Sequence, residues 1–544
     1  MVAFVYACVR LTHSIRYVPM SQPNRLRQYQ LRKLWLLRMA TLMLALSPFL
    51  ALEGLLYVLR WPELPPPADP FVDLHNLRPL FQLEPQTGRM AISPERFNLF
   101  RPASFALNKP ADTFRVFALG GSTTQGEPYS IETAFPQWMQ LDLQAAQPDR
   151  TVEAVNCGGL SYASYRVLAI LREVLHYSPD LVVVYCGHNE YLERRTYAPY
   201  RASSLFYRSL SWLSGLRTVQ LARSLAGQSA KRPEPQRVAG TEQTTLQAEV
   251  DALLDYRGGL ADYQRGAKWT KPIAEHFRWN LEQMCTECQQ AGVPLILIRP
   301  VSNLLDCPPL KFEIDPELLP DLQKQFEQHW TAARAALEIS SDSDEELAHE
   351  SNALPQHASP DPAMDELHRA LAIDPQHAGA LYLLGQLQWA SGDYQSARET
   401  LRRARDCDVC PLRATSELAS IVTQVAQQRR VPLLDAEQLF SQRSPHELVG
   451  ERWLLDHVHP ILEGHQLLGE KLARLCFELE LLPPPPDDWD SRRQVLINEQ
   501  LSDLNEAYFH RGQQRLAGLR LWTQGRASKV RQIWPDAPPS APSP

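Results

Sequence analysis

A Gly-Gly-Ser-Thr-Thr turn at residues 120–124 directly follows an apolar run, so Ser122 is expected at the carboxyl end of a strand and near a helix start. Backbone N–H groups and the helix dipole favour negative charge at such a place. A serine hydroxyl there could attack an acyl carbon, with the developing oxyanion held by the turn. The turn makes Ser122 a candidate nucleophile.

The residues of this turn do not have the spacing of other glycine-rich motifs. A P-loop needs a lysine after its second glycine, and residues 115–129 contain no lysine. The dinucleotide fingerprint needs Gly-x-Gly-x-x-Gly, whereas the glycines here are Gly120, Gly121 and Gly126. The Gly-x-Ser-x-Gly elbow is absent around Ser122 as well. Phosphate cradling is therefore disfavoured.

A serine in a turn is more often a helix cap than a nucleophile, so its partners decide between the two. Asp456 and His459 are three residues apart, close enough for the carboxylate to orient an imidazole that accepts the serine proton. Asn189, in a stretch after another apolar run, offers a neutral amide donor suited to a tetrahedral oxyanion. Together with Ser122, these residues predict acyl-transfer chemistry.

Taken in order, these stretches resemble the sequence blocks of the SGNH (GDSL-type) hydrolase superfamily. The first block is matched at 120–122, with Gly121 in place of the family's acidic residue. The third block is matched at 187–190 and the fifth at 456–459. The resemblance covers about 110–305 and 412–478 of the chain.

The resemblance implies that Ser122 is the nucleophile, His459 the general base and then acid, and Asp456 the residue that orients the imidazole. It also implies an oxyanion hole made by Ser122, Asn189 and a backbone N–H of the second block. Counted from Asn156, the glycine position of that block holds Ser161, which is chemically permissible because the donor is a backbone group. Three residues stay open as this donor: Gly158, Gly159 and Ser161.

No cofactor and no metal are expected. His457 makes a His-x-His pair with His459, but no third ligand stands at a helpful spacing. Two Cys-x-x-Cys pairs, at 285/288 and 407/410, could bind zinc or form disulfides, yet both end helix-like segments and nothing in the sequence brings them together. Their oxidation state stays open.

Four further polar residues border the candidate stretches. Asn303 could line the cleft or serve a turn, and Arg413 is a possible anion contact. Glu127 and Glu190 are expected to be solvated.

The overall composition is that of a globular, multidomain protein. The 544 residues are 44% hydrophobic and 22% charged, and the formal net charge is −7. A small negative net charge does not favour binding to the phosphates of nucleic acid, so no nucleic-acid partner is expected.

An apolar stretch near the N-terminus, Met39–Leu59, predicts a single membrane span with Glu53 as its one charge. Basic residues precede it at 25, 27, 32, 33 and 38, which by the positive-inside rule places the N-terminus in the cytoplasm and the rest in the periplasm. A cleaved signal peptide is the alternative, but no clear small-x-small cleavage site follows the run. An uncleaved membrane anchor is favoured.

Five short apolar runs alternate with helix-period stretches after residue 110. The runs are 114–119, 152–157, 181–186, 295–300 and 431–435. The helix-period stretches are 131–145, 164–177, 270–291 and 414–429. Such alternation indicates an α/β fold with a parallel sheet covered on both faces. With the resemblance, it predicts a three-layer α/β/α flavodoxin-like sandwich.

The gap between the fourth and fifth runs holds an insert with tetratricopeptide (TPR) periodicity. Small and apolar residues at 397, 401 and 404 recur one repeat earlier as Ala363, Leu367 and Ala370. A TPR-like helical region is therefore expected over roughly 363–410, with a further helix at 316–338 and a protein partner as one use of the surface. An amphipathic helix is expected at about 491–526.

These patterns predict seven parts. They are a cytoplasmic segment (1–38), a transmembrane helix (39–59), a linker (60–84), a first part of the hydrolase domain (85–315), the TPR-like insert (316–411), a second part of the hydrolase domain (412–480) and a C-terminal helix with a Pro-rich tail (481–544).

The predicted function is that of a membrane-anchored serine esterase acting through an acyl-enzyme on O-acyl esters of an extracytoplasmic glycan or lipid. Two alternatives stay open. The same triad could transfer an acetyl group to a surface polysaccharide, or the chain could be a non-catalytic scaffold that uses its repeat. Substrate identity and oligomeric state are not encoded in any motif.

Overall fold

The computed structural model describes residues 24–59, 69, 71–74, 78–194, 216–219, 221, 245–246, 249–255, 258–337 and 360–524. The chain divides into two compact units. One consists of Met1–Pro70 with Ala198–Glu242, and the other of Phe71–Tyr197 with Gln243–Pro544.

The smaller unit is built on helix α2, Asn24–Val58, which contains Pro48. Its stretch Lys33–Val58 is the one helix in the described part of the chain that is long and apolar enough to cross a membrane, a test that signal sequences also pass. Glu53 on this helix accepts hydrogen bonds from the backbone N–H groups of Arg217 and Thr218 and from the Thr218 hydroxyl. The acidic group of the apolar stretch is thus hydrogen-bonded within its own unit.

The larger unit contains a parallel sheet of five strands. The strands are β5 (Thr113–Gly120), β6 (Thr151–Gly158), β7 (Leu181–Tyr185), β9 (Leu295–Arg299) and β10 (Leu433–Asp435), in the order β10-β9-β7-β5-β6. Each of the five apolar runs falls on one strand, which confirms the α/β prediction. Numbered along the chain, the order is 2-1-3-4-5, the doubly wound order of flavodoxin-like sheets. Ligand sites in such sheets lie at the carboxyl ends of the strands at the topological switch point, here between β5 and β7.

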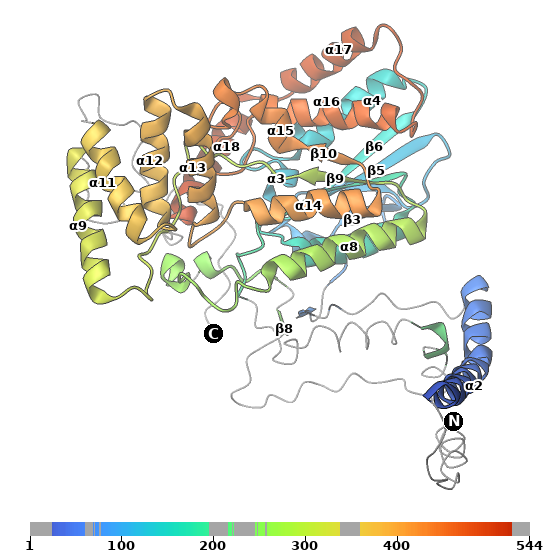
Figure 1. Cartoon of the computed structure of the whole chain (residues 1–544). Helices are drawn as coiled ribbons and strands as arrows, with labels where there is room; N and C mark the ends of the chain where they lie inside the picture. The colour runs from blue at the N-terminus through green and yellow to red at the C-terminus, as the bar shows by residue number, and fades with distance from the viewer. Residues whose placement is uncertain are drawn as a thin grey trace. The chain divides into compact units, whose positions relative to one another are not determined.

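Helices cover both faces of this sheet because side chains alternate along each strand. On β7, Val182 and Val184 face one core cluster, whereas Leu181, Val183 and Tyr185 face the other. The first cluster packs against α5 (Ser164–Val174), α8 (Ile273–Ala291) and α14 (Ser416–Arg429). The second packs against α4 (Phe135–Ala146), α15 (Ala436–Ser441) and α16 (Leu462–Glu478). Figure 1 shows α8 and α14 side by side below the sheet, and α4 and α16 above it.

A second, antiparallel sheet precedes β5 and was not predicted from the sequence. Its strands are β2 (Phe81–Glu84), β3 (Arg89–Ile92) and β4 (Ser104–Ala106). Phe81 and Phe105 stack edge-on against each other and against Phe117 of β5. The folded body therefore begins well before residue 85. Strands of three or four residues, interrupted by turns, carry too little periodicity to be recognised in sequence.

The insert between β9 and β10 is helical, with its own core. Its helices are α9 (Pro320–Ala336), α11 (Pro360–Ile373), α12 (Ala378–Ala390) and α13 (Tyr394–Asp406). Ala363, Leu367 and Ala370 are fully buried, as their repeat positions predict. A Cβ on Gly385 would lie 2.6 Å from Leu401 Cγ, so glycine permits α12 and α13 to pack at close range.

The C-terminal segment forms two helices, so the single helix expected at 491–526 is wrong. They are α17 (Trp489–Ser502) and α18 (Glu506–Thr523). The side chain of Asn505 accepts a hydrogen bond from the Tyr508 N–H and so begins a new helix. Trp489 and Arg493 bond Asp142 of α4, which fixes α17 to the larger unit.

Candidate active site

Ser122 begins α3 (Ser122–Gln125), a single turn of helix immediately after β5. The preceding residue, Gly121, is extended, and Gly126 ends the turn in the left-handed region at φ 94°. The serine side chain is partly exposed, whereas Thr123, Thr124 and Gln125 are buried. The chain therefore presents Ser122 at the carboxyl end of β5.

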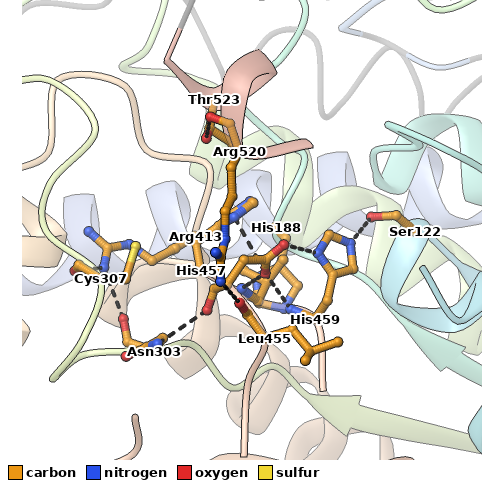
Figure 2. Close-up of polar contacts among 12 residues, drawn as sticks. Ser122, His188, Asn303, Cys307, Arg413, Leu455, His457, His459, Arg520 and Thr523 are labelled. Carbon is orange, nitrogen blue, oxygen red and sulfur yellow. Dashed lines mark hydrogen bonds and ion pairs between the residues drawn. The ribbon is translucent and has the colours of Figure 1, made fainter. Parts of the chain in front are cut away.

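His459 and Asp456 reach Ser122 from a loop 337 positions further along the chain. His459 Nε2 lies 2.8 Å from Ser122 Oγ, and its Nδ1 lies 2.7 Å from Asp456 Oδ2 (Figure 2). The other carboxylate oxygen of Asp456 accepts the backbone N–H groups of Val458 at 2.8 Å and His459 at 2.9 Å. The structure thus brings together the three residues that the sequence singled out.

The electrostatics of this pair suit a proton-accepting imidazole. Burial would lower the pKa of His459, but the charge and hydrogen bond of Asp456 outweigh burial and raise that pKa above its ordinary value. Burial would likewise raise the pKa of Asp456, yet the two neighbouring histidines and its hydrogen bonds hold that pKa far below its usual range. Asp456 is therefore ionised at neutral pH and stabilises a protonated His459.

The loop that carries Asp456 is held by residues from two other segments. Asn303 Nδ2 donates to the Asp456 carbonyl at 3.2 Å, and the Asn303 N–H donates to the His457 carbonyl at 3.0 Å. Arg413 is buried and donates to the carbonyls of Asn303 and Cys307. Of the two roles left open for Asn303, the structure therefore shows the loop-forming one. The Arg413 guanidinium binds backbone carbonyls rather than an external anion.

Asn189 lies beside the nucleophile turn. Its Nδ2 donates to the Tyr162 carbonyl at 3.1 Å, and a Cβ on Gly121 would lie 2.5 Å from the same nitrogen. A distance of that size excludes any side chain larger than hydrogen unless Asn189 moves. A larger residue at position 121 would therefore displace the Asn189 amide from its place beside the turn.

The three open donors of the second block differ in their hydrogen bonds. Gly158 N donates to Asn156 Oδ1 at 2.9 Å, and Gly159 N donates to the Gly120 carbonyl at 3.0 Å. Ser161 lies in the left-handed region at φ 60°, the conformation that a glycine would adopt readily. Among the described residues its N–H has no acceptor. Of the three, Ser161 is the one with a free donor.

The two glutamates expected in solvent are both buried, and those expectations are wrong. Glu190 accepts hydrogen bonds from the N–H and the hydroxyl of Ser164 at the start of α5, so it ties the Asn189 segment to that helix. Glu127 forms an ion pair with Arg101 and contributes to the raised pKa of His459. In both cases tertiary contacts that are distant in sequence supply the partner.

Two more histidines lie near the triad. His188 Nδ1 accepts a hydrogen bond from the Ala414 N–H, and burial lowers the pKa of His188 to about 3. Burial also lowers the pKa of His457 to about 4, so both rings are neutral at pH 7. Side-chain atoms of Asp456, His457 and His459 lie within 4.8 Å of one another, close enough for a metal ion. Both ring nitrogens of His459 are, however, already committed to Asp456 and Ser122.

The described cysteines are free thiols, in a set that leaves out only Cys8. Cys285 and Cys288 are buried on α8 in the same core cluster. Burial raises the pKa of Cys285 to about 11 and that of Cys288 to about 12, so both stay protonated at neutral pH. These thiols pack as small apolar groups.

Helix α18 borders the site, which no motif in the sequence indicated. Arg520 Nη2 donates to the Leu455 carbonyl at 3.1 Å, next to Asp456 (Figure 2). At the other end of the helix, Tyr508 bonds the Thr133 hydroxyl at 2.8 Å and stacks on Tyr129. An amphipathic helix does not specify the surface that it covers, so only the folded chain reveals this neighbour.

Comparison with known proteins identifies the insert directly. A tetratricopeptide repeat family model matches residues 358–409, which confirms the periodicity seen in the sequence. No curated protein matches the chain.

Solved structures of acyl hydrolases resemble the chain only distantly. A lipase/acylhydrolase from Enterococcus faecalis is 14% identical, with 69% of this chain and 100% of that chain covered at a TM-score of 0.29. An acetylxylan esterase from Geobacillus stearothermophilus is 12% identical, with 66% and 93% covered at a TM-score of 0.28. An α/β hydrolase from the metagenome of Lake Arreo is 12% identical, with 67% and 95% covered at 0.28. TM-scores this low carry no argument about the chemistry of this chain.

Proposed function

We propose that the protein is a serine esterase of SGNH type that cleaves O-acyl esters through an acyl-enzyme on Ser122. The observation that carries the proposal is the unbroken hydrogen-bonded series from Ser122 Oγ to His459 at 2.8 Å and from His459 to Asp456 at 2.7 Å. A serine, an imidazole and an ionised carboxylate in this arrangement are the elements of a nucleophilic triad.

The reaction follows from the roles of these three groups. His459 Nε2 accepts the hydroxyl proton as Ser122 Oγ attacks the acyl carbon, and Asp456 stabilises the imidazolium that forms. The imidazolium then gives the proton to the leaving alkoxide, which departs as an alcohol. Water, deprotonated by the same nitrogen, attacks the acyl-serine and releases the acid.

The tetrahedral intermediates of both steps carry negative charge on the former carbonyl oxygen. In this proposal, the Ser122 and Ser161 N–H groups and the Asn189 amide donate to that oxygen. Each donor of this kind contributes about 3 kcal/mol to transition-state stabilisation. The free N–H of Ser161 and the place of Asn189 against Gly121 support these assignments.

The cellular setting in the proposal rests on α2. Basic residues concentrate ahead of the apolar stretch, so the helix would anchor the chain with its N-terminus in the cytoplasm and the catalytic domain in the periplasm. The acyl ester would then belong to a glycan or lipid of the cell surface, and the TPR insert would bind a protein partner. Fusion of a periplasmic reporter after residue 60 and after residue 544 tests the topology.

A chromogenic acyl ester tests the activity itself. With 4-nitrophenyl acetate, Ser122→Ala should lower kcat by roughly 10⁴-fold or more, because the nucleophile is removed. Ser502→Ala makes the same chemical change on α17, where the hydroxyl bonds only the Glu499 carbonyl, and should leave kcat unchanged. Equal inactivity of wild type and Ser122→Ala over a range of acyl chain lengths would favour the scaffold alternative. Acetate release against acetyl transfer to an added glycan separates hydrolysis from acyl transfer.

A further inference from the structure

A second pocket, separate from the triad, lies between α5 and the short helix η1 (Pro94–Arg96). Its volume is about 240 Å³. Two buried guanidinium groups, Arg96 and Arg166, and the Tyr162 ring line it, and Ala169 and Ile170 of α5 supply an apolar wall. None of the triad residues lines this pocket.

The two arginines differ in how their charge is balanced. Arg166 pairs with the buried Glu193 through two hydrogen bonds of 2.7 and 2.6 Å. Arg96 is 2% exposed, and no carboxylate in the described part of the chain forms an ion pair with it. Its guanidinium donates to the Arg78 carbonyl and to the Tyr162 hydroxyl and lies over the Phe100 ring. The Arg96 Nε is buried without a hydrogen-bond partner among the described residues.

A buried charge without a counter-charge is costly, and so is a buried donor without an acceptor. An anion in the pocket would supply the missing counter-charge at Arg96. The acid that lines the pocket, Glu173, does not serve this purpose, because its oxygens accept the N–H groups of Leu80 at 2.6 Å and Phe81 at 2.8 Å. Its negative charge on the wall also disfavours anions with more than one charge.

We propose that this pocket binds a short-chain monocarboxylate, with the carboxylate on Arg96 and the alkyl group against Ala169 and Ile170. Guanidinium and carboxylate match in geometry and charge, and the apolar wall suits a few methylene groups. A volume of about 240 Å³ is large enough for such a molecule.

The pocket is connected to the candidate oxyanion hole through one residue. The Tyr162 hydroxyl contacts Arg96, and the Tyr162 carbonyl accepts the Asn189 amide. An anion on Arg96 would therefore change the support of Asn189. This second step rests on the proposed esterase function, in which carboxylates are also the product, whereas binding itself does not.

Calorimetric titration of the full-length protein in detergent tests binding without turnover. Acetate and butyrate, balanced with chloride at constant ionic strength, should give saturable one-to-one binding to wild type and to Ser122→Ala. Arg96→Gln should weaken binding about tenfold or more through loss of a charge-assisted contact. Ala169→Leu narrows the pocket at its apolar wall without altering a charge and should weaken binding, so it tests the proposal if Arg96→Gln does not fold.

Several results would overturn the proposal. Absence of saturable binding to wild type would do so, as would unchanged affinity in Ala169→Leu. Loss of binding in Ser122→Ala alone would place the carboxylate at the triad instead. Inorganic phosphate that binds at Arg96 as tightly as butyrate would contradict the assignment to monocarboxylates.

The proposed effect of a bound carboxylate on catalysis is tested separately, by steady-state kinetics. A carboxylate that competes at the triad raises KM alone, whereas one that acts through Arg96 and Tyr162 changes kcat. With a chromogenic ester, butyrate should change kcat in wild type but not in Ala169→Leu. If kcat is unaffected in both while calorimetry shows binding at Arg96, the connection through Tyr162 is wrong and the pocket stands alone.

Discussion

The Asp456 carboxylate accepts hydrogen bonds from the His459 ring and from the backbone N–H groups of Val458 and His459, and its side chain is 6% exposed. Its spacing from His459 suggested this role in the sequence, since a three-residue turn lets a carboxylate reach the imidazole that follows. The support from Asn303 and Arg413 could not be predicted, because it depends on loops brought together by the fold.

This arrangement predicts a pH profile for ester hydrolysis. His459 acts as a base only when neutral, and Asp456 raises its pKa, so kcat/KM should rise with pH through a pKa above the ordinary histidine value. Asp456→Asn should shift that midpoint to lower pH and reduce kcat by about 10⁴-fold. Rates measured from pH 5 to 9 on both proteins check this. A midpoint that does not move in Asp456→Asn would argue against the pair.

Gly121 gives a second prediction at the residue scale. Gly121→Ala places a methyl group 2.5 Å from Asn189 Nδ2, so the amide must leave its position. We expect kcat to fall by about 10² to 10³-fold, as for loss of one oxyanion donor. Asn189→Ala should cost a similar amount, and the double variant no more than either, because both changes remove one contact. Additive losses in this cycle would show that Gly121 acts in another way.

At the scale of elements, the strands were easier to predict than the segments that cover them. Strands β5 and β7 are compact apolar runs, because both of their faces are buried. The small antiparallel sheet and the break before α18 depend on contacts with the rest of the unit. The sequence therefore predicted the elements that hold Ser122 and Asn189, but neither the break before α18 nor the place of that helix beside the site.

Docking of α18 predicts a measurable stability effect. Tyr508 is buried, stacks on Tyr129 and bonds the Thr133 hydroxyl. Tyr508→Ala should destabilise the protein by about 3 kcal/mol, as large-to-small changes of aromatic residues do. Tyr508→Phe keeps the ring and loses only the hydroxyl contact, so it should cost about 1 kcal/mol. Urea unfolding of both variants measures the difference, and equal small effects would mean that α18 is not firmly docked.

At the scale of the whole molecule, the sheet order joins residues that are far apart in sequence. The 2-1-3-4-5 order puts the carboxyl ends of β5 and β7 side by side, which places Ser122 near Asn189. The alternation of runs and helices predicted the class of this fold. The last strand and the His459 loop lie in the expected second part of the hydrolase domain, 412–480, after the TPR insert.

Buried histidines predict how the stability of the folded chain depends on pH. Burial lowers the pKa of four rings well below the unfolded value. They are His188 (about 3), His377 (about 4), His457 (about 4) and His465 (about 3). Between these pKa values and about 6.5, the unfolded chain binds more protons than the folded chain. The free energy of unfolding is therefore highest above about pH 6.5 and falls as the pH drops towards 4. His459 opposes this trend, since its raised pKa favours the folded state at low pH.

Urea unfolding at pH 7 and pH 5 measures this dependence. His377 lies in the insert, away from the triad, where it caps α12 by accepting the Ala380 N–H. His377→Asn keeps a cap and removes one titrating ring, so the loss of stability between the two pH values should be smaller than in wild type. An unchanged or larger loss would contradict the assignment of this ring.

The most direct test of the central claim is covalent labelling of the nucleophile. Wild-type protein treated with phenylmethylsulfonyl fluoride and digested should show a sulfonyl group on the peptide that contains Ser122, as determined by mass spectrometry. His459→Ala should show little or none at the same exposure, because the hydroxyl then lacks its proton acceptor. Equal labelling of the two proteins, or labelling of other serines with Ser122 unmodified, would contradict a triad formed by Ser122, His459 and Asp456.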